Sequence, residues 1–411
     1  MIVSLVSLVS HWCARRGCFA QDRETLPSLT KAQWQEDVRF LGRELVKRHK
    51  NVFHHVSREE FEHDIAALEQ AVPTLEAHQI VVRMLQITAK VGDAHTYVHM
   101  PNSFKIYPLI LYWFGKELRV IGASRTYPTL LGARVVKIEG LELAEVNDRL
   151  RTIMSQDEND WFNLNNGPGY MVYPEVLHTL GVVKDPTHVL LTLESDQGQP
   201  FLIDIRAATR EVPFDWLLFP KELPLYRRRP SEQFWFEYLE DKQTVYVGFR
   251  GYDSFNRSAQ ELLDFIDHHP TKKLVIDLRQ NGGGDFTKVR KSLLPALKQR
   301  SQINQKGNLF VIIGRHTFSA AMTNAIDFRK ETNAILVGEP VGEKPNSYQE
   351  NDDFRLPNSH LRVSYSTRYY KFQDEDTPAL MPDVRIDPSW EAFRAGRDPV
   401  MEWILAYQQG K

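Results

Sequence analysis

Between about residues 30 and 90 the apolar residues recur every three to four positions, which is the period of a helix with one buried face. The first such stripe consists of Trp34, Val38, Leu41 and Leu45. Ser57 and Glu60 have the spacing of a capping box, in which two side chains bond the free backbone N–H groups at the start of a helix. The pattern predicts an N-terminal helical region over residues 21–95.

Short alternating runs replace this pattern from about residue 96. Apolar and polar residues alternate in segments such as 134–138 and 188–193, and glycine, proline and asparagine separate the segments. This arrangement is typical of short strands joined by turns. One helical stripe, at residues 143–154, interrupts them. We therefore expect a strand-rich module over residues 96–206.

Continuous apolar runs alternate with amphipathic stretches from residue 243 onward. The runs predict strands at residues 244–249, 273–278, 308–313 and 334–337, and the stretches between them predict helices at 258–268, 288–297 and 319–330. Buried strands that alternate with helices form parallel βαβ units, so the fold class is α/β. Ligands of such sheets bind beyond the carboxyl ends of the strands. We place the catalytic domain at residues 207–411 and search the turns at those strand ends.

Composition narrows the classes of function. The 411 residues are 42% hydrophobic and 25% charged, which is ordinary for a globular protein and argues against disorder. The formal charge of -2 provides no general field for a polyanion, so we expect no nucleic-acid partner. The only cysteines are Cys13 and Cys18, and the zinc-peptidase motif HExxH is absent. We therefore expect no metal, no cofactor and no thiol nucleophile.

The first 20 residues form a candidate signal peptide. Residues 1–10 are apolar, and Ala20 offers a small residue at a cleavage site. Arg15 and Arg16 follow the apolar run instead of preceding it, which departs from the usual order of a secretory signal. The run is too short to span a bilayer, so we expect no membrane span. Export to the periplasm or outside the cell is the prediction, with the cytoplasm as the alternative.

Three glycines follow a predicted buried strand, in the turn that runs from Asp277 to Gly284. Gly282, Gly283 and Gly284 would let a ligand approach the backbone closely and contact its N–H groups. The structural alternative is a flexible turn. The turn lacks the Lys-Ser/Thr pair of a phosphate loop and the spacing of a dinucleotide fingerprint, so it predicts neither.

A serine and a lysine occupy the ends of the next two predicted strands. Ser319 would lie at the start of a helix, where free N–H groups and the helix dipole favour a developing negative charge. Lys344 lies in the glycine-containing loop after the following strand, and a desolvated lysine can accept the proton of a serine hydroxyl. A capping serine and a solvated lysine are the ordinary alternatives.

Taken together, three segments resemble the C-terminal-processing (tail-specific) serine peptidases and their tricorn-like relatives. These segments are LVIDLRQNGGG, HTFSAAM and VGEPVGEK. The resemblance implies a ClpP/crotonase-like βαβ core in which Ser319 is the nucleophile and Lys344 is the base. The segment 131–140 also resembles the centre of a PDZ module, so the strand-rich module is expected to be PDZ-like.

The sequence departs from the family pattern around the lysine. Tyr348 stands where the processing peptidases have a glutamine that orients the lysine, and Glu343 stands where they have a glycine. The segment 92–96 resembles a histidine motif of the tricorn-like branch. This second resemblance implies His95 as an alternative base and Asp376, before the pair Pro382-Asp383, as an alternative acid. The resemblance therefore leaves the identity of the base open.

We expect a serine-type peptidase that hydrolyses protein or peptide substrates, acting on their C-terminal regions. The oxyanion of the reaction would be held by backbone N–H groups of Gly282, Gly283, Gly284 and Ala320. One alternative is a non-catalytic peptide-binding protein of the same fold. A second is an acyl-CoA enzyme of the crotonase type, in which Ser319 and Lys344 would have no role. The sequence makes no prediction about the oligomeric state.

Overall fold

Three helices form the N-terminal region, as the helical period predicts: α2 (Lys31–Arg48), α3 (Arg58–Ala71) and α4 (Ala77–Ala89). The hydroxyl of Ser57 accepts the N–H of Glu60 at 3.1 Å and so caps α3. The Glu60 carboxylate accepts from the Lys90 ammonium at 2.9 Å, so this ion pair takes the place of the expected return bond of a capping box. Because Lys90 follows α4, the ion pair ties α3 to the end of the helix that leads into the segment of His95.

The computed structural model describes residues 26–210, 215–220 and 222–408. The candidate signal peptide and both cysteines lie outside the described residues. Within the described residues, no helix combines the length and the apolar character needed to cross a membrane. Short 3-10 helices occupy Val72–Thr74, Pro128–Leu130, Leu225–Arg227 and Glu240–Lys242.

An antiparallel sheet forms most of the next region and confirms its strand-rich character. Its main path is β2 (Leu109–Phe114), β3 (Glu117–Ser124), β4 (Arg134–Ile138), β6 (His188–Glu194) and β7 (Pro200–Arg206), while β5 (Leu141–Glu142) pairs with β4 and β8 (Trp216–Leu218) with β3. The single expected helix is replaced by three: α5 (Leu143–Arg151), α6 (Asp160–Tyr170) and α7 (Pro174–Thr179). Helix α6 could not be predicted because it contains Gly167, Pro168 and Gly169, which disfavour helix.

The C-terminal part contains the predicted parallel sheet. Its order is β16 (Val384–Arg385), β13 (Ile335–Gly338), β12 (Leu309–Ile313), β11 (Lys273–Asp277), β10 (Thr244–Phe249) and β9 (Phe234–Leu239). All neighbours are parallel except β9, which pairs antiparallel with β10. The buried strands and the mixed α/β class are therefore confirmed.

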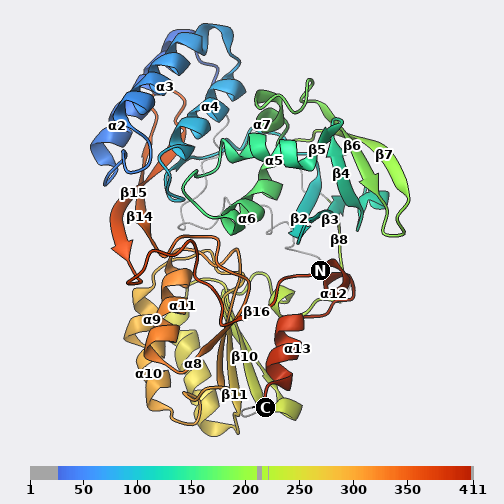
Figure 1. Cartoon of the computed structure of the whole chain (residues 1–411), viewed down its shortest axis with the longest axis vertical. Helices are drawn as coiled ribbons and strands as arrows, with labels where there is room; N and C mark the ends of the chain where they lie inside the picture. The colour runs from blue at the N-terminus through green and yellow to red at the C-terminus, as the bar shows by residue number, and fades with distance from the viewer. Residues whose placement is uncertain (1–25, 211–214, 221, 409–411) are drawn as a thin grey trace.

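Helices cover both faces of this sheet (Figure 1). One face packs on α8 (Phe255–His268), α9 (Thr287–Lys291), α10 (Leu293–Gln299) and α11 (Ala320–Glu331). The other face packs on α13 (Pro399–Ala406), which follows α12 (Trp390–Arg394). Burial on both faces explains why the strands are continuous apolar runs without alternation.

A long hairpin links the two halves of the molecule. Its strands β14 (Asn346–Arg355) and β15 (Arg362–Lys371) rise from the parallel sheet toward the N-terminal helices (Figure 1). There β15 pairs with β1 (Tyr97–Val98), with Tyr97 opposite Ser364 and Val98 opposite Val363. The hairpin starts just after the loop of Lys344, and β1 starts just after His95. The pairing therefore brings these two distant segments to the same place.

Candidate active site

Ser319 occupies a sharp turn between β12 and α11. Its backbone has φ 53° and ψ -121°, a left-handed conformation that is costly for a residue with a side chain. Two bonds to the neighbouring strand end hold the turn. The Thr317 hydroxyl donates to the Leu278 carbonyl at 2.9 Å, and the Phe318 N–H donates to the Asn281 carbonyl at 3.0 Å. A strained serine at a strand-to-helix turn presents its hydroxyl in the manner of a nucleophile elbow.

His95 lies in the loop between α4 and β1 and is 1% exposed. The carboxylate of Asp93 accepts the His95 N–H at 3.1 Å and the Ser366 hydroxyl at 2.6 Å, and it bonds His49 Nε2 at 2.9 Å. Although burial opposes ionisation, the hydrogen bond and charge of His49 lower the pKa of Asp93 below its ordinary value. Asp93 is therefore an ionised anchor that fixes the backbone of His95.

The structure brings His95 to the hydroxyl of Ser319. His95 Nε2 lies 3.2 Å from Ser319 Oγ, and His95 Nδ1 lies 3.5 Å from Glu343 Oε1. The other carboxylate oxygen of Glu343 accepts the backbone N–H of Ser319. The Phe318 ring stacks on the imidazole with centroids 4.8 Å apart. These contacts fix the orientation of the imidazole, with one nitrogen at the hydroxyl and the other at a carboxylate.

Glu343 reaches this position because the loop after β13 is packed tightly. A Cβ atom on Gly342 would lie 2.4 Å from the Arg315 carbonyl oxygen, so only glycine allows this approach. The Arg315 guanidinium bonds the Glu339 carboxylate at 3.1 Å and the Trp113 carbonyl at 3.0 Å. In the sequence, Glu343 is recognisable only as a departure from the family pattern. Its full burial, with 0% exposure, identifies it as part of the site.

The structure does not place Lys344 at the serine. Its ammonium donates to the Asp157 carboxylate at 2.5 Å, and its backbone N–H donates to the Glu158 carboxylate at 3.0 Å. This placement differs from the expected Ser-Lys dyad. Adjacent residues of the loop point in different directions, so that Glu343 reaches the imidazole while Lys344 turns to the segment before α6.

The alternative acid is also placed elsewhere. Asp376 is exposed and accepts from the Asn346 amide at 2.7 Å. The carboxylate at His95 Nδ1 is that of Glu343. The sequence could have indicated Glu343 only through its place in the glycine-containing loop, because nothing in the local pattern separates a buried glutamate from a solvated one.

The glycine turn lies against the serine, as expected. A Cβ atom on Gly283 would lie 2.8 Å from Ser319 Cβ and 3.3 Å from its Oγ. The Gly283 N–H donates to the Asn281 side chain at 3.0 Å, which holds the turn in shape. The Ala320 N–H opens α11, where the first N–H groups have no carbonyl partner within the helix. Gly282 and Gly284 flank Gly283 in this turn, and Ala320 directly follows Ser319.

The charged residues at the end of β11 have a structural role. Arg279 bonds both Asp277 and Asp398, with its Nη2 2.6 Å and 2.7 Å from their carboxylates. Asp398 also caps α13. This network ties the end of β11 to the last helix.

Glu158 lies close enough to Glu343 for their charges to interact. Burial, and then the negative charge of Glu343, raise the pKa of Glu158 well above its ordinary value. At pH values between the unfolded and the folded pKa, the folded state therefore holds a proton that the unfolded state has released. The stability that this group contributes is present below its unfolded pKa and is lost as pH rises through the raised value.

We expect Glu158→Gln to stabilise the protein at pH 8 by on the order of 1 kcal/mol, because the amide needs no proton to be neutral and can still accept from Lys344. The gain should shrink toward pH 5. Urea unfolding at both pH values measures it, and Glu240→Gln, at an exposed glutamate, is the matched control. A gain that is equal at both pH values would contradict the assignment.

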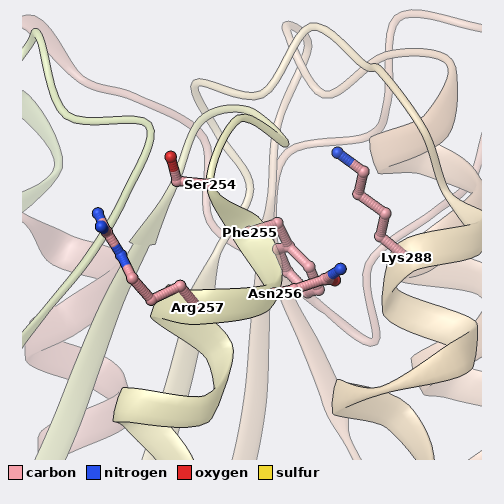
Figure 2. Close-up of a pocket in the computed structure, with 5 residues that line it drawn as sticks. All are labelled: Ser254, Phe255, Asn256, Arg257 and Lys288. Atoms are coloured by element: carbon pink, nitrogen blue, oxygen red, sulfur yellow. The ribbon is translucent and has the colours of Figure 1, made fainter.

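A separate hollow of about 210 Å³ lies at the start of α8, lined by Ser254, Phe255, Asn256, Arg257 and Lys288. Figure 2 shows Arg257 and Lys288 on opposite sides of Phe255, so their charges do not converge. Lys288 donates to the Tyr252 carbonyl at 3.0 Å. We assign no chemistry to this hollow. Among the described residues, no group of three or more histidine, cysteine, aspartate or glutamate side chains is arranged to hold a metal.

A comparison with protein-family models finds no match, and a comparison with curated proteins finds none either. Solved structures do match. Mature CPAF has a TM-score of 0.60 at 11% identity, covering 92% of this chain and 96% of that chain, and CPAF complexed with lactacystin has 0.58 at 10% identity, covering 92% and 97%. The photosystem II D1 C-terminal processing protease covers 89% and 98% at 14% identity, but its TM-score of 0.40 supports no argument. The chain thus has the fold of CPAF, and the family resemblance of its motifs is confirmed at the level of fold.

Proposed function

We propose that this protein is a serine peptidase in which Ser319 is the nucleophile, His95 the general base and Glu343 the carboxylate that orients the base. The observation that carries the proposal is the contact of 3.2 Å between His95 Nε2 and Ser319 Oγ, with a Glu343 carboxylate oxygen 3.5 Å from His95 Nδ1 on the other side of the ring. A hydroxyl, an imidazole and a buried carboxylate in this order form the arrangement that activates a serine in unrelated hydrolases.

In the proposed reaction the Ser319 hydroxyl attacks the carbonyl carbon of a peptide bond. Its proton passes to His95 Nε2, and the resulting imidazolium is stabilised by the Glu343 carboxylate at Nδ1. His95 then returns the proton to the leaving amine, which departs and leaves an acyl-enzyme on Ser319. Water hydrolyses this ester by the same proton transfers in the second half of the cycle.

The tetrahedral oxyanion is assigned to backbone donors around the serine. The Ser319 N–H is bonded to Glu343, and the Gly283 N–H is bonded to Asn281. The Ala320 N–H and the N–H groups of Gly282 and Gly284 are therefore the proposed donors. The N-terminus of α11 adds its dipole to this site.

The parallel sheet and its helices are proposed as a ClpP/crotonase-like catalytic domain over residues 207–411, and residues 96–206 as a PDZ-like module. This module would receive the tail of a protein substrate by strand addition, which would direct cleavage to C-terminal regions. Export by residues 1–20 completes the proposal.

The same site argues against three alternatives. The Ser-Lys dyad requires the Lys344 amine at the serine, whereas its ammonium is bound by Asp157 at 2.5 Å. A peptide-binding protein without activity would not need an imidazole at the hydroxyl of a strained serine. An acyl-CoA enzyme of the crotonase type would use the oxyanion donors but would leave Ser319, His95 and Glu343 without a role.

We expect a fluorophosphonate probe to label the protein at Ser319, because only an activated serine reacts with this electrophile at a useful rate. Intact-mass analysis and peptide mapping measure the adduct. Ser319→Ala should not be labelled, and Ser301→Ala, at an exposed serine after α10, should be labelled like the wild type. A protein that shows no adduct at Ser319 would be the inactive peptide-binding alternative.

A further inference from the structure

A cavity of about 400 Å³ lies beside the catalytic group. Its wall includes Asp93, two residues before His95, and Lys344, directly after Glu343. The volume falls within the range of small-ligand sites. Because the two loops that carry the base and its carboxylate also form the cavity, a peptide held at Ser319 can place one of its groups there.

Negative groups dominate the lining of this cavity. The carboxylates are those of Asp93, Asp157, Glu158 and Asp376, and Lys344 is the one lysine or arginine among the lining residues. Asp93 is bonded by His49, and Glu158 holds a proton because burial raises its pKa, which leaves the carboxylates of Asp157 and Asp376 against a single ammonium. Burial lowers the pKa of His54, so its imidazole adds no charge at neutral pH. The electrostatic balance favours a cation as the occupant.

Aromatic rings form another side of the same cavity. The rings of His54 and Tyr348 have centroids 4.3 Å apart, and those of Tyr348 and Tyr369 are 4.9 Å apart at 62°. Tyr369 is 48% exposed, so part of its ring surface is accessible to a ligand. Aromatic faces attract ammonium and guanidinium groups, and they do so in addition to carboxylates. The aromatic lining is an independent sign of a cation site.

The chain itself shows that an alkylammonium fits. Lys344 places its Nζ 2.5 Å from the Asp157 carboxylate, and the lysine side chain remains 28% exposed. The ion pair is also open to solvent on the side of Asp157, whose side chain is 41% exposed. Partly exposed ion pairs are weak, so a second cation can compete with Lys344 for this carboxylate.

We propose that this cavity binds a cationic group of the peptide substrate between the carboxylates of Asp157 and Asp376 and the rings of Tyr348 and Tyr369. Lys344 is the resident cation with which the substrate competes. The cation is either a lysine or arginine side chain or the free amino terminus of the peptide. This inference rests on the proposed peptidase function and names the substrate class of that site.

The test uses the full chain and sets of internally quenched peptides. Within one set the peptides differ at a single position, which carries lysine, norleucine or glutamate. The sets differ in where along the peptide this position lies. Each peptide is made with a free and with an acetylated amino terminus. We expect kcat/KM for the best lysine peptide to exceed that of its norleucine partner by at least about tenfold. A preference that acetylation abolishes would assign the cavity to the amino terminus, and one that acetylation leaves would assign it to the side chain.

The variants are chosen to move the preference in opposite directions. Asp376→Asn and Asp157→Asn should each reduce the preference for lysine over norleucine at least about threefold, since each removes a carboxylate. Lys344→Met should increase it by a similar factor, because it removes the competing ammonium, and a folding defect cannot produce this gain. Asp241→Asn, at an exposed aspartate on the turn after β9, is the control and should leave the preference as in the wild type.

A binding measurement separates this inference from the peptidase function. Ser319→Ala should bind a fluorescent lysine peptide more tightly than its norleucine partner, and adding Asp376→Asn should remove the difference. If no peptide is hydrolysed but this difference is found, the cavity proposal stands and the peptidase function fails. If peptides are hydrolysed but lysine and norleucine are bound and cleaved equally, the cavity proposal is overturned and the peptidase function stands.

Discussion

Ser319→Ala is expected to reduce kcat for peptide hydrolysis about 10⁴-fold or more. In serine peptidases the loss of the nucleophile alone removes nearly all of the contribution of the catalytic group, because the base and the carboxylate act only through the hydroxyl. The residual rate comes from the oxyanion donors and from substrate binding, which the substitution leaves in place. The affinity for the peptide should therefore change little, and the loss should fall on kcat.

Initial rates with a quenched peptide, measured at enzyme concentrations set from absorbance, test this expectation. Ser301→Ala is the control for the loss of a hydroxyl elsewhere on the surface. Alanine also fits the left-handed backbone of residue 319 no worse than serine does, so the variant should unfold at a similar temperature. Hydrolysis by Ser319→Ala at the wild-type rate would end the peptidase proposal.

The strands of the parallel core could be predicted because their burial on both faces requires continuous apolar runs. The hairpin of β14 and β15 could not. The sequence of β14 is NSYQENDDFR, in which charged and amide side chains predominate. It is a strand because it pairs along its length with β15, which in turn pairs with β1. Such tertiary pairing overrides local preference, and a single sequence contains no signal for it.

The site could be predicted only in part, because one of its contacts depends on this hairpin. Ser319 and the glycine turn lie at the ends of adjacent parallel strands, so topology alone brings them together. His95 lies 224 positions before Ser319, and only a family resemblance indicated it. The pairing of β1 with β15 is what brings it to the serine. A contact created by a hairpin that the sequence does not reveal cannot be derived from the sequence.

The choice between Glu343 and Lys344 shows a finer limit. Both residues lie in one loop, and either could have faced Ser319 on the evidence of spacing. The direction is decided by the partners that meet the loop, which are Asp157 and Glu158 from the segment before α6. That segment precedes α6, which could not be predicted because of its glycine and proline residues. Because this helix could not be predicted, the positions of Asp157 and Glu158, and hence the direction of Lys344, could not be predicted either.

His95→Ala is expected to reduce kcat/KM about 10⁴-fold for an uncharged norleucine peptide, whereas Lys344→Met should retain activity within about tenfold of the wild type. The histidine takes the proton of Ser319 and returns it to the leaving group, and without it both transfers lose their carrier. Lys344 acts at Asp157, on the far side of the loop. The uncharged peptide is essential, because a cationic substrate would also report the change in the cavity.

The pair of variants decides between two bases in one measurement. The hypothesis of a Ser-Lys dyad requires the reverse outcome, in which Lys344→Met is inactive and His95→Ala keeps most of its activity. The pH profile adds a second readout, since the acid limb of kcat/KM should persist in Lys344→Met if His95 is the base.

Glu343→Gln tests the carboxylate of the same assignment, because the amide can still accept the Ser319 N–H but carries no charge to stabilise the imidazolium. It should therefore lower kcat while leaving the fold intact, and a wild-type kcat in Glu343→Gln would show that another group orients His95.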